Sequence, residues 1–222
     1  MDEKLLESVI REAVNNKATQ LSGDYFNDCT HIPEIIGELT YLERLFIDYS
    51  KITELPASIG QLKNLSFFRL WGNNNLKSLP ELISGCEKLE YLEVSCADIK
   101  ELPQSICNLK NLKYLYLNGV SLEFLPNKLP ESIVIIDLSS NKLKELPDNL
   151  ADYKELKRVR LGDNSLKALP VSLCESSINH KIRVDLGGRQ NFKRILPDKY
   201  KANEDFFIMQ GCILPMKSVD EY

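Results

Sequence analysis

The sequence predicts an α/β solenoid built from stacked repeats, and three observations support this. A short pattern with apolar residues at its first, fourth and sixth positions recurs six times between residues 42 and 161. Successive copies start 23, 24, 23, 21 and 23 residues apart. A Leu-Pro step follows every copy. Periods of roughly 20 to 29 residues are typical of such arrays, because one unit cannot bury its apolar face alone and stacking buries it.

The first 41 residues are predicted to contain a cap helix and a degenerate first repeat. Asp2 suits the N-cap position of a helix over residues 2–16. Apolar residues recur there at helical spacing, namely at Leu5, Leu6, Val9, Ile10, Ala13 and Val14. We expect this amphipathic helix to cover the first strand, and a membrane-binding or partner-binding helix is the alternative. Residues 19–39 resemble a weakened copy of the repeat.

Each regular repeat within residues 42–177 is predicted to contain a short strand and an outer turn. Alternating apolar residues such as Leu45 and Ile47 place two side chains on one face of a strand. After the Leu-Pro step, apolar residues three apart, such as Ile59 and Leu62, suit a helical or 3₁₀ turn on the outer side. The proline restrains the backbone where the chain turns. Stacked strands then form a parallel sheet with a spacing of about 4.8 Å.

Residues 178–222 are predicted to form a degenerate last repeat and a C-terminal cap or tail. Residues 182–186 alternate like one more strand. Residues 190–222 match no repeat, but they contain enough apolar side chains for a cap: Phe192, Ile195, Leu196, Tyr200, Phe206, Phe207 and Ile208. Chain ends of this kind are often poorly ordered, so we expect disorder from about Lys217.

The repeats resemble the leucine-rich-repeat family, specifically the LPxxIxxLxx-type repeats of bacterial proteins and of intracellular Ras-group-like proteins. The resemblance rests on the pattern LxxLxLxxNxLxxLP and covers Leu42 to Leu173. It implies a curved solenoid with the parallel sheet on the concave side and short helical or 3₁₀ turns on the convex side. It also implies a protein–protein interaction module whose partner the sequence does not identify.

The ninth position of the repeat is asparagine in three copies, Asn73, Asn141 and Asn164. The family resemblance implies that this side chain bonds backbone groups of adjacent turns. Ser50, Ala97 and Val120 stand at the other ninth positions. Alanine and valine side chains cannot form such bonds, so a weaker ladder is expected near Ala97 and Val120.

Charge and cysteine content exclude several classes of protein. The 222 residues have a net charge of -4, and the sequence pI is about 5.4, which disfavours a nucleic-acid partner. The N-terminus has no secretory pattern and no run is long enough to span a membrane, so we expect a cytoplasmic protein. A secreted effector acting in a host cytosol is the alternative.

The six cysteines contain no CxxC pair and are expected to be free thiols without a metal site.

Catalytic motifs are absent from the sequence, so no catalytic residue, no cofactor and no enzymatic activity are expected. The sequence contains two histidines, His31 and His180, and no motif places a nucleophile beside either of them. Gly187-Gly188-Arg189 suits an altered turn better than a phosphate-binding loop. Cys96-Ala97-Asp98 resembles the Cys-x-Asp element of bacterial leucine-rich-repeat ubiquitin ligases. A ligase fragment is therefore a weak alternative, since Cys96 instead occupies the strand exit of its repeat.

The third, fifth and seventh positions of each repeat are expected to project from the concave sheet. They bring six aromatic residues onto adjacent strands: Phe46, Phe67, Trp71, Tyr91, Tyr114 and Tyr116. Exposed contiguous aromatic residues typically mark an interaction site. Aromatic stacking that stabilises the sheet is the alternative, and both roles are compatible.

Charged residues alternate along the fifth positions. Arg69 is predicted to neighbour Glu93, and Asp137, Arg160 and Asp185 follow in series. Cross-strand ion pairing is the first explanation, and a charge-complementary footprint is the second. The predicted partner-binding surface comprises Phe46, Phe67, Arg69, Trp71, Tyr91, Glu93, Tyr114, Tyr116, Arg158 and Arg160. We expect a monomer, and a structural or regulatory subunit with an idle sheet is the alternative function.

Overall fold

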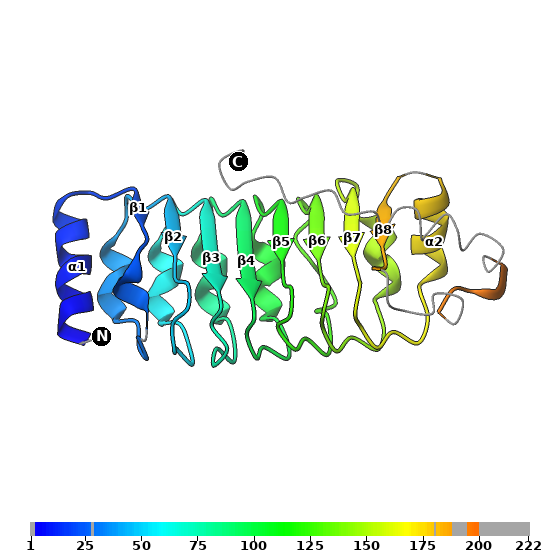
Figure 1. Ribbon diagram of the computed structural model, residues 1–222. Coiled ribbons are helices and arrows are strands. Elements are labelled where there is room, and N and C mark those ends of the chain that lie inside the picture. The colour runs from blue at the N-terminus through cyan, green and yellow to red at the C-terminus, as the bar shows by residue number, and fades with distance from the viewer. Residues whose placement is uncertain (1–2, 28, 180, 188–194, 200–222) are drawn as a thin grey trace.

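The computed structural model describes residues 3–27, 29–179, 181–187 and 195–199. Within them, eight parallel strands form one sheet in sequence order, so each strand pairs only with its chain neighbours (Figure 1). The strands are β1 (Gln20–Leu21), β2 (Arg44–Phe46), β3 (Phe67–Trp71), β4 (Tyr91–Ser95), β5 (Tyr114–Tyr116), β6 (Ile135–Asp137), β7 (Arg158–Arg160) and β8 (Arg183–Asp185). The predicted curved repeat solenoid is confirmed.

The leucine pattern builds the core because its residues project to one side of every strand. Leu45, Phe68, Leu92, Leu115 and Ile136 are consecutive register partners across five strands. All five are fully buried. They belong to one continuous apolar core that runs the length of the solenoid. Each repeat therefore contacts its two neighbours and completes their burial.

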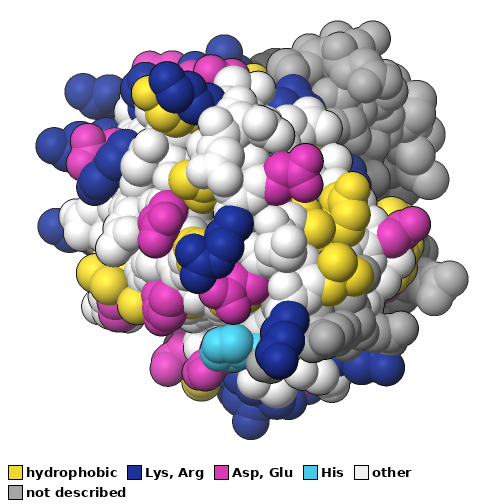
Figure 2. Space-filling view, turned by 90° about the vertical axis from the view of Figure 1, so that its left-hand side faces the viewer, with side chains coloured by type: hydrophobic (Ala, Val, Ile, Leu, Met, Phe, Trp, Pro, Cys, Tyr) yellow, Lys and Arg dark blue, Asp and Glu magenta, His cyan; other side chains and the backbone are white. Residues whose placement is uncertain are grey.

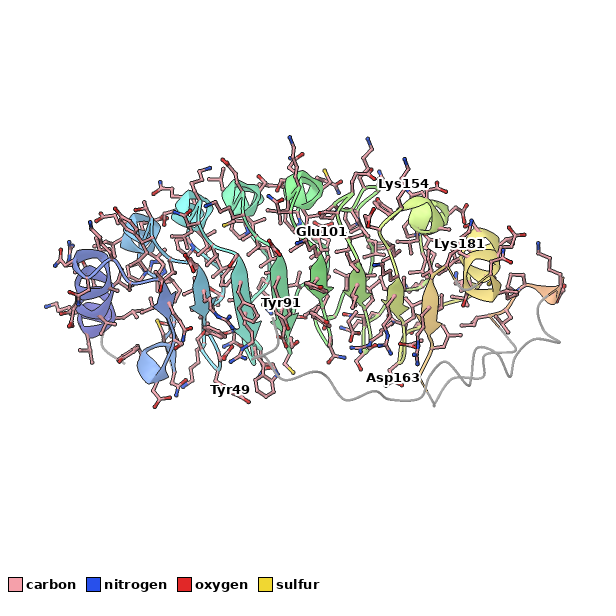
Figure 3. All side chains as sticks on the ribbon, turned by 90° about the horizontal axis from the view of Figure 1, so that it is seen from above. Tyr49, Tyr91, Glu101, Lys154, Asp163 and Lys181 are labelled. Carbon is pink, nitrogen blue, oxygen red and sulfur yellow. The ribbon has the colours of Figure 1, made fainter. Side chains whose placement is uncertain are left out.

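Short helices cover the convex side of the solenoid, as the sequence predicts (Figure 3). They are η2 (Glu34–Glu38), η3 (Ala57–Gln61), η4 (Glu81–Gly85), η5 (Gln104–Asn108), η6 (Asp148–Asp152) and the α-helix α2 (Val171–Ile178). The short helix η1 (Asp24–Phe26), which follows β1, lies on the opposite side of the sheet (Figure 3). A proline immediately precedes each helix of the convex side, with φ between -55 and -70°. Proline thus holds the extended conformation from which each helix begins.

The repeat between β5 and β6 differs from the others, because no described helix covers its outer side. This repeat has the 21-residue spacing, the shortest of the five. Its outer segment contains a second Leu-Pro step, and Pro130 has no N–H to donate to a helical turn. The segment is instead anchored by the Leu129 N–H, which donates to the Tyr153 hydroxyl at 2.7 Å. The expected outer helix is therefore missing from this repeat.

The N-terminal helix α1 (Glu3–Asn15) closes the first end of the solenoid, as predicted. Leu6 and Ile10 are buried and the helix packs on η1 and η2, whereas Leu5 is exposed. The helix ends at Asn15, and the positive φ of 52° at Lys17 allows the Ala18 N–H to donate back to the Ala13 carbonyl. Hydrophobic, acidic and basic side chains are mixed on this end of the molecule (Figure 2). The predicted N-cap, Asp2, lies outside the described residues.

The asparagines at the ninth position bridge adjacent turns, as the family resemblance implied. The Asn73 side chain accepts from the Ser50 N–H and donates to the Ile47 carbonyl. Asn141 accepts from the Val120 and Leu122 N–H groups at 3.2 and 2.8 Å. The backbone at Val120 is thus held by the next repeat, although valine itself offers no bond. The weaker ladder expected near Ala97 and Val120 stays a prediction.

The C-terminal end continues the sheet in β8, so the strand predicted over residues 182–186 is confirmed. Beyond it, Ile195 and Leu196 are buried, and the Ile195 carbonyl accepts from the Leu169 N–H at 2.8 Å. The other residues predicted to form a cap, Phe192, Tyr200, Phe206, Phe207 and Ile208, lie outside the described residues, as does the segment from Lys217. His180, Gly188, Arg189 and Cys212 lie outside them as well.

Candidate interaction surface on the concave sheet

The concave surface is organised in rows, because residues at equal repeat positions are register partners. The third positions form one row across seven strands: Arg44, Phe67, Tyr91, Tyr114, Ile135, Arg158 and Arg183. The fifth positions form a second row: Phe46, Arg69, Glu93, Tyr116, Asp137, Arg160 and Asp185. The structure therefore brings the predicted surface residues together on one face of the sheet.

Aromatic rings in these rows stack on one another rather than standing free. The Phe67 and Tyr91 rings are parallel, with centroids 4.2 Å apart and planes 7° apart. Phe46 and Tyr116 extend the stack, 5.1 Å from Phe67 and 5.3 Å from Tyr91. Phe67, Tyr91 and Tyr116 are only 5 to 9% exposed and form a second apolar cluster apart from the main core. The expected exposure of these three residues is therefore wrong, since neighbouring rings cover one another.

Two guanidinium groups cover the N-terminal end of this aromatic stack. Arg44 lies over the Phe67 ring at 4.6 Å, and Arg69 lies over the Phe46 ring at 4.7 Å. Cations favour this position over the electron-rich face of a ring. The stack is thus fixed by packing and by charge, which makes it a rigid platform.

Arg69 pairs with Asp48 and not with its register neighbour Glu93. Its Nε and Nη2 atoms donate to both Asp48 carboxylate oxygens over 2.5 to 3.2 Å. Burial alone would lower the pKa of Arg69, but the hydrogen bonds and charge of Asp48 raise it above its usual value. Glu93 instead accepts from the Tyr91 hydroxyl at 2.9 Å, and burial followed by the Glu93 charge raises the pKa of Tyr91. The predicted adjacency of Arg69 and Glu93 is correct, and the ion partner is Asp48.

The exposed aromatic residues lie beside the stack, at the strand exits. Trp71 and Tyr49 are 43 and 58% exposed, and their rings are 5.2 Å apart. Tyr49 has a positive φ of 53° and its ring lies against Gly72, which itself has a φ of 73°. The backbone N–H of Trp71 donates to the Asp48 carboxylate at 3.1 Å. Tyr49 projects from the side of the sheet opposite the outer helices (Figure 3). Among the described residues of the concave side, this pair is the most exposed aromatic surface.

Tyr49 was missed from the predicted surface because it occupies the eighth position. The eighth residue of every regular repeat has a positive φ: Tyr49, Gly72, Cys96, Gly119, Ser140 and Asp163. Glycine is favoured there, and a large aromatic residue is unusual in this conformation. A tyrosine at a position held by glycine in two other repeats is the signal that could have identified it.

A hollow of about 340 Å³ opens next to this aromatic pair. Strands β1 to β3 and the loop after β1 supply its walls: Gln20, Ser22, Gly23, Asp24, Asn27, Phe46, Asp48, Tyr49 and Arg69. It combines aromatic, acidic and amide groups, so it can hold a polar or basic side chain beside an apolar one. The sequence pattern did not predict this hollow, because the loop over residues 22–27 belongs to the degenerate first repeat.

Ion pairs dominate the C-terminal part of the surface, as the alternating charges predicted. Arg160 bonds Asp137 at 3.1 Å, and Arg158 and Arg183 both bond Asp185, at 2.5 and 2.9 Å. The two aspartates are 7 and 8% exposed. A buried carboxylate is stable only with such partners. These arginines therefore also keep the sheet's own charges compensated.

The thiols differ sharply in their surroundings. Burial raises the pKa of Cys86 to about 12 and that of Cys174 to about 11. Cys96 is exposed at a strand exit, and the adjacent Asp98 bonds Lys77 at 2.6 Å. No group of three potential metal ligands occurs in the part of the chain that the structure describes. None of its described helices is long and apolar enough to cross a bilayer.

Two further hollows flank the exposed ring of Phe124, outside the concave sheet. They measure about 600 and 620 Å³. The first is lined by the Leu-Pro segments of three successive repeats, including Pro147 and Pro170. Phe124 is 54% exposed and belongs to the repeat that lacks an outer helix. Among the described residues, Phe124 is the one aromatic residue that lines these two hollows, so they offer fewer aromatic side chains than the concave surface.

Several solved structures have the same fold. A leucine-rich-repeat protein of Leptospira interrogans matches with a TM-score of 0.56 and 25% identity over 86% of this chain and 60% of its own. The plant peptide hormone receptor RGFR1, solved in complex with RGF2, matches with 0.62 and 30% over 71 and 26%. TLR13, solved with ssRNA13, matches with 0.59 and 24% over 75 and 23%.

These three structures are longer than the matched region, since the chain spans 60% or less of each of them. No protein-family model matches the chain, and no curated protein matches it. The similarity to solved structures therefore rests on the repeat architecture.

Proposed function

Since the chain is a leucine-rich-repeat protein, we propose that the concave face of its sheet binds a protein partner. The exposed Tyr49–Trp71 pair beside a hollow of about 340 Å³ is the observation that carries this proposal. Tryptophan and tyrosine dominate the binding energy of protein interfaces when they fill a partner's pocket. The binding surface extends from this pair over Phe46 and Arg69 to Tyr114. An enzymatic role is not part of the proposal.

The aromatic stack supports the proposal by keeping the surface rigid. Phe67, Tyr91 and Tyr116 are locked against one another, so binding orders few further side chains. A surface that is already ordered loses less conformational entropy when a partner binds. Binding and structural stacking are thus two roles of the same residues. The buried rings shape the surface, and the exposed rings make the contacts.

The kind of partner is proposed from one similar structure and from the shape of the concave sheet. RGFR1, a plant peptide hormone receptor, was solved in complex with RGF2, and it matches 71% of the present chain at 30% identity. A shallow curved sheet with one hollow suits an extended protein segment, since such a segment can follow the rows of side chains. We therefore propose an extended segment of a protein as the bound element.

The experiment compares the wild-type chain with a Tyr49→Ala/Trp71→Ala double variant in affinity capture followed by mass spectrometry. Both side chains are exposed, so their removal is expected to leave the melting temperature nearly unchanged while a partner captured by the wild type is lost. The matched control is Leu82→Ala, which removes a 57% exposed apolar side chain from the convex helix η4. Loss with the double variant and retention with the control support the proposal.

Retention of the partner by both variants would contradict the concave site. The second candidate is an assembly role that uses the surface around Phe124, because this ring lies exposed between two hollows. In that case Phe124→Ser, and not the concave double variant, abolishes capture. Light scattering at high concentration separates self-assembly from binding of another protein, since the proposed concave module is a monomer.

A further inference from the structure

One arginine of the concave rows differs from the others in having no carboxylate of its own chain. Arg69 bonds Asp48. The three arginines of β7 and β8 bond Asp137 or Asp185. The side chain of Arg44 on β2 forms neither an ion pair nor a hydrogen bond with any residue that the structure describes. Its charge is therefore not compensated within this surface.

The neighbours of Arg44 on the concave sheet are uncharged. Its register partners are Gln20 on β1 and Phe67 on β3. Phe46 follows two positions later on the same strand, so its side chain lies on the same face. No carboxylate of the two rows thus stands directly beside the guanidinium group.

The guanidinium group of Arg44 is held in place by aromatic rings. Its Cζ atom is 4.6 Å from the centroid of Phe67 and 5.7 Å from that of Phe46. Phe67 is itself stacked on Tyr91, so the ring below the cation is fixed. The Arg44 Nε atom is buried and has no hydrogen-bond partner, which is rare for a polar atom in a folded protein. The cation is therefore ordered and partly removed from water before a partner binds.

The terminal nitrogens of Arg44 remain available to a ligand. Arg44 is partly exposed, and Nε is the one atom of its side chain that is buried without a bond. The two terminal nitrogens of a guanidinium can donate to both oxygens of a carboxylate at once, which fixes direction as well as charge. An ion pair is stronger where water is partly excluded than on an open surface. A carboxylate is therefore the ligand that best suits this group.

The hollow of about 340 Å³ lies next to Arg44, because Gln20 and Phe46 both line it and both neighbour this arginine. The hollow also contains Asp24, whose Oδ1 atom accepts from the Asn27 amide at 3.1 Å. Asp24 forms no ion pair with Arg44, so it does not compensate the guanidinium charge. A segment that places one side chain on Arg44 can thus place a neighbouring side chain in the hollow.

We propose that Arg44 binds the carboxylate of an acidic residue in the extended partner segment, and that the adjacent hollow holds a neighbouring side chain of the same segment. The inference rests on the proposed function and specifies the partner's chemistry. Charge complementarity carries it, since Arg44 is the cation of the concave rows for which the described residues supply no anion.

The test uses an array of short peptides of leucine, tyrosine and serine, each present with a central glutamate and with a central glutamine. The best-binding pair is then labelled and measured by fluorescence anisotropy. The glutamate peptide is expected to bind the wild-type chain about tenfold more tightly than its glutamine counterpart, and added salt is expected to reduce this ratio. Equal affinity of the two peptides, or an array without any binder, overturns the inference.

The variant that tests the site is Arg44→Gln, which removes the charge from the concave surface. We expect it to weaken the glutamate peptide by about tenfold and to leave the glutamine peptide unaffected, so that the preference disappears. The matched control is Arg11→Gln, which changes the net charge equally but alters a 60% exposed side chain of α1. Arg44→Lys keeps the charge without the planar fork and is expected to recover only part of the affinity. A preference that survives in folded Arg44→Gln overturns the inference.

Folding and the proposed function are controlled separately. Thermal melts show whether each Arg44 variant is folded, and if Arg44→Gln is not, a folded Arg44→Lys that binds the glutamate peptide as tightly as the wild type overturns the inference. If Tyr49→Ala/Trp71→Ala abolishes capture of the protein partner while Arg44→Gln leaves capture and the glutamate preference unchanged, the proposed function stands and this inference fails. If a single-stranded oligonucleotide binds more tightly than the glutamate peptide, the ligand class is wrong.

Discussion

At the scale of single residues, the eighth position of the repeat joins backbone strain to the candidate surface. Four of the six regular repeats have a non-glycine residue there with a positive φ. A left-handed conformation costs a residue with a Cβ atom roughly 1 to 2 kcal/mol. Tyr49 adopts it nevertheless, and the conformation holds its ring against Trp71 and over Gly72. The exposed aromatic pair therefore depends on a glycine in the next repeat.

Gly72→Ala is expected to disrupt this pair. Its new Cβ would lie 2.6 Å from the Tyr49 ring, and φ is 73°. Gly119→Ala is the matched control, since φ is 65° and the nearest heavy atom to its Cβ is 3.9 Å away. We expect both variants to lose roughly 1 to 2 kcal/mol of stability. Only Gly72→Ala should also shift the fluorescence of the single tryptophan, and equal spectra would contradict the packing.

Thiol reactivity is the second prediction at this scale. The raised pKa values of Cys86 and Cys174, caused by burial, keep both thiols protonated at pH 8, and a protonated thiol is a poor nucleophile. Cys96 is exposed. With Ellman's reagent, Cys96→Ser is expected to remove a fast-reacting thiol, whereas Cys86→Ser should leave the fast phase unchanged. A fast phase that persists without Cys96 and disappears without Cys86 would show that the burial is wrong.

At the scale of elements, the outer helices are joined by carboxylates as well as by packing. Glu81 at the start of η4 accepts from the Gln104 and Ser105 N–H groups at 3.2 and 3.0 Å. These groups begin η5, so one repeat caps the helix of the next. The helices also approach closely, since a Cβ added to Gly60 would lie 2.1 Å from the Leu82 carbonyl oxygen. Hydrogen bonds and close contacts between neighbouring repeats thus set the spacing of the helices on the convex side.

The Glu81 cap makes stability depend on pH. Hydrogen bonds from the side chain and then the N–H of Ser105 lower the pKa of Glu81 below its ordinary 4.5. A group whose pKa is lower in the folded state stabilises the fold above its unfolded pKa, and this stabilisation is lost as the pH falls through the folded pKa.

Glu81→Gln is therefore expected to lower the melting temperature at pH 7 and to have a smaller effect at pH 3. The control is Glu101→Gln, which changes an exposed glutamate of the following segment (Figure 3). Differential scanning fluorimetry at both values of pH measures the difference. An effect of Glu81→Gln that is equal at pH 3 and pH 7 would exclude the cap as its source.

At the scale of the whole molecule, stability is distributed along a line. Every strand pairs with its chain neighbours, so contacts of each repeat are nearly all with the repeats beside it. Such arrays lose structure locally when one end is damaged, because the stabilising contacts join neighbouring repeats and not distant ones. The cap helix α1 protects the first of these interfaces with Leu6 and Ile10.

Removing part of the cap is expected to destabilise the N-terminal repeats first. Ile10→Ala truncates a fully buried side chain, which typically costs about 2 to 5 kcal/mol. Leu5→Ala in the same helix removes a side chain that is 52% exposed and is the control. Hydrogen exchange with mass spectrometry should show faster exchange in α1, β1 and β2 and little change in β7. Uniformly faster exchange would mean that the solenoid unfolds as one unit.

Features that depend on a local pattern follow from the amino-acid sequence alone. The period of the leucines determined the parallel sheet, and alternation determined which side chains reach the concave face. Five of the six Leu-Pro steps of the regular repeats determined where an outer helix begins. These features follow from residues a few positions apart, whose effects the chain repeats in every copy. The rows through Tyr91, Tyr114 and Arg158 could therefore be predicted without coordinates.

The tertiary structure decided which of those residues are covered and which partner each one takes. Phe67 and Tyr91 bury each other, Arg69 bonds Asp48 rather than Glu93, and Tyr49 reaches Trp71 from an unexpected position. Each outcome is a competition among side chains from different repeats, 21 to 24 residues apart in the chain. Burial and pairing depend on distances across strands of only a few ångströms, and a one-dimensional pattern does not contain them.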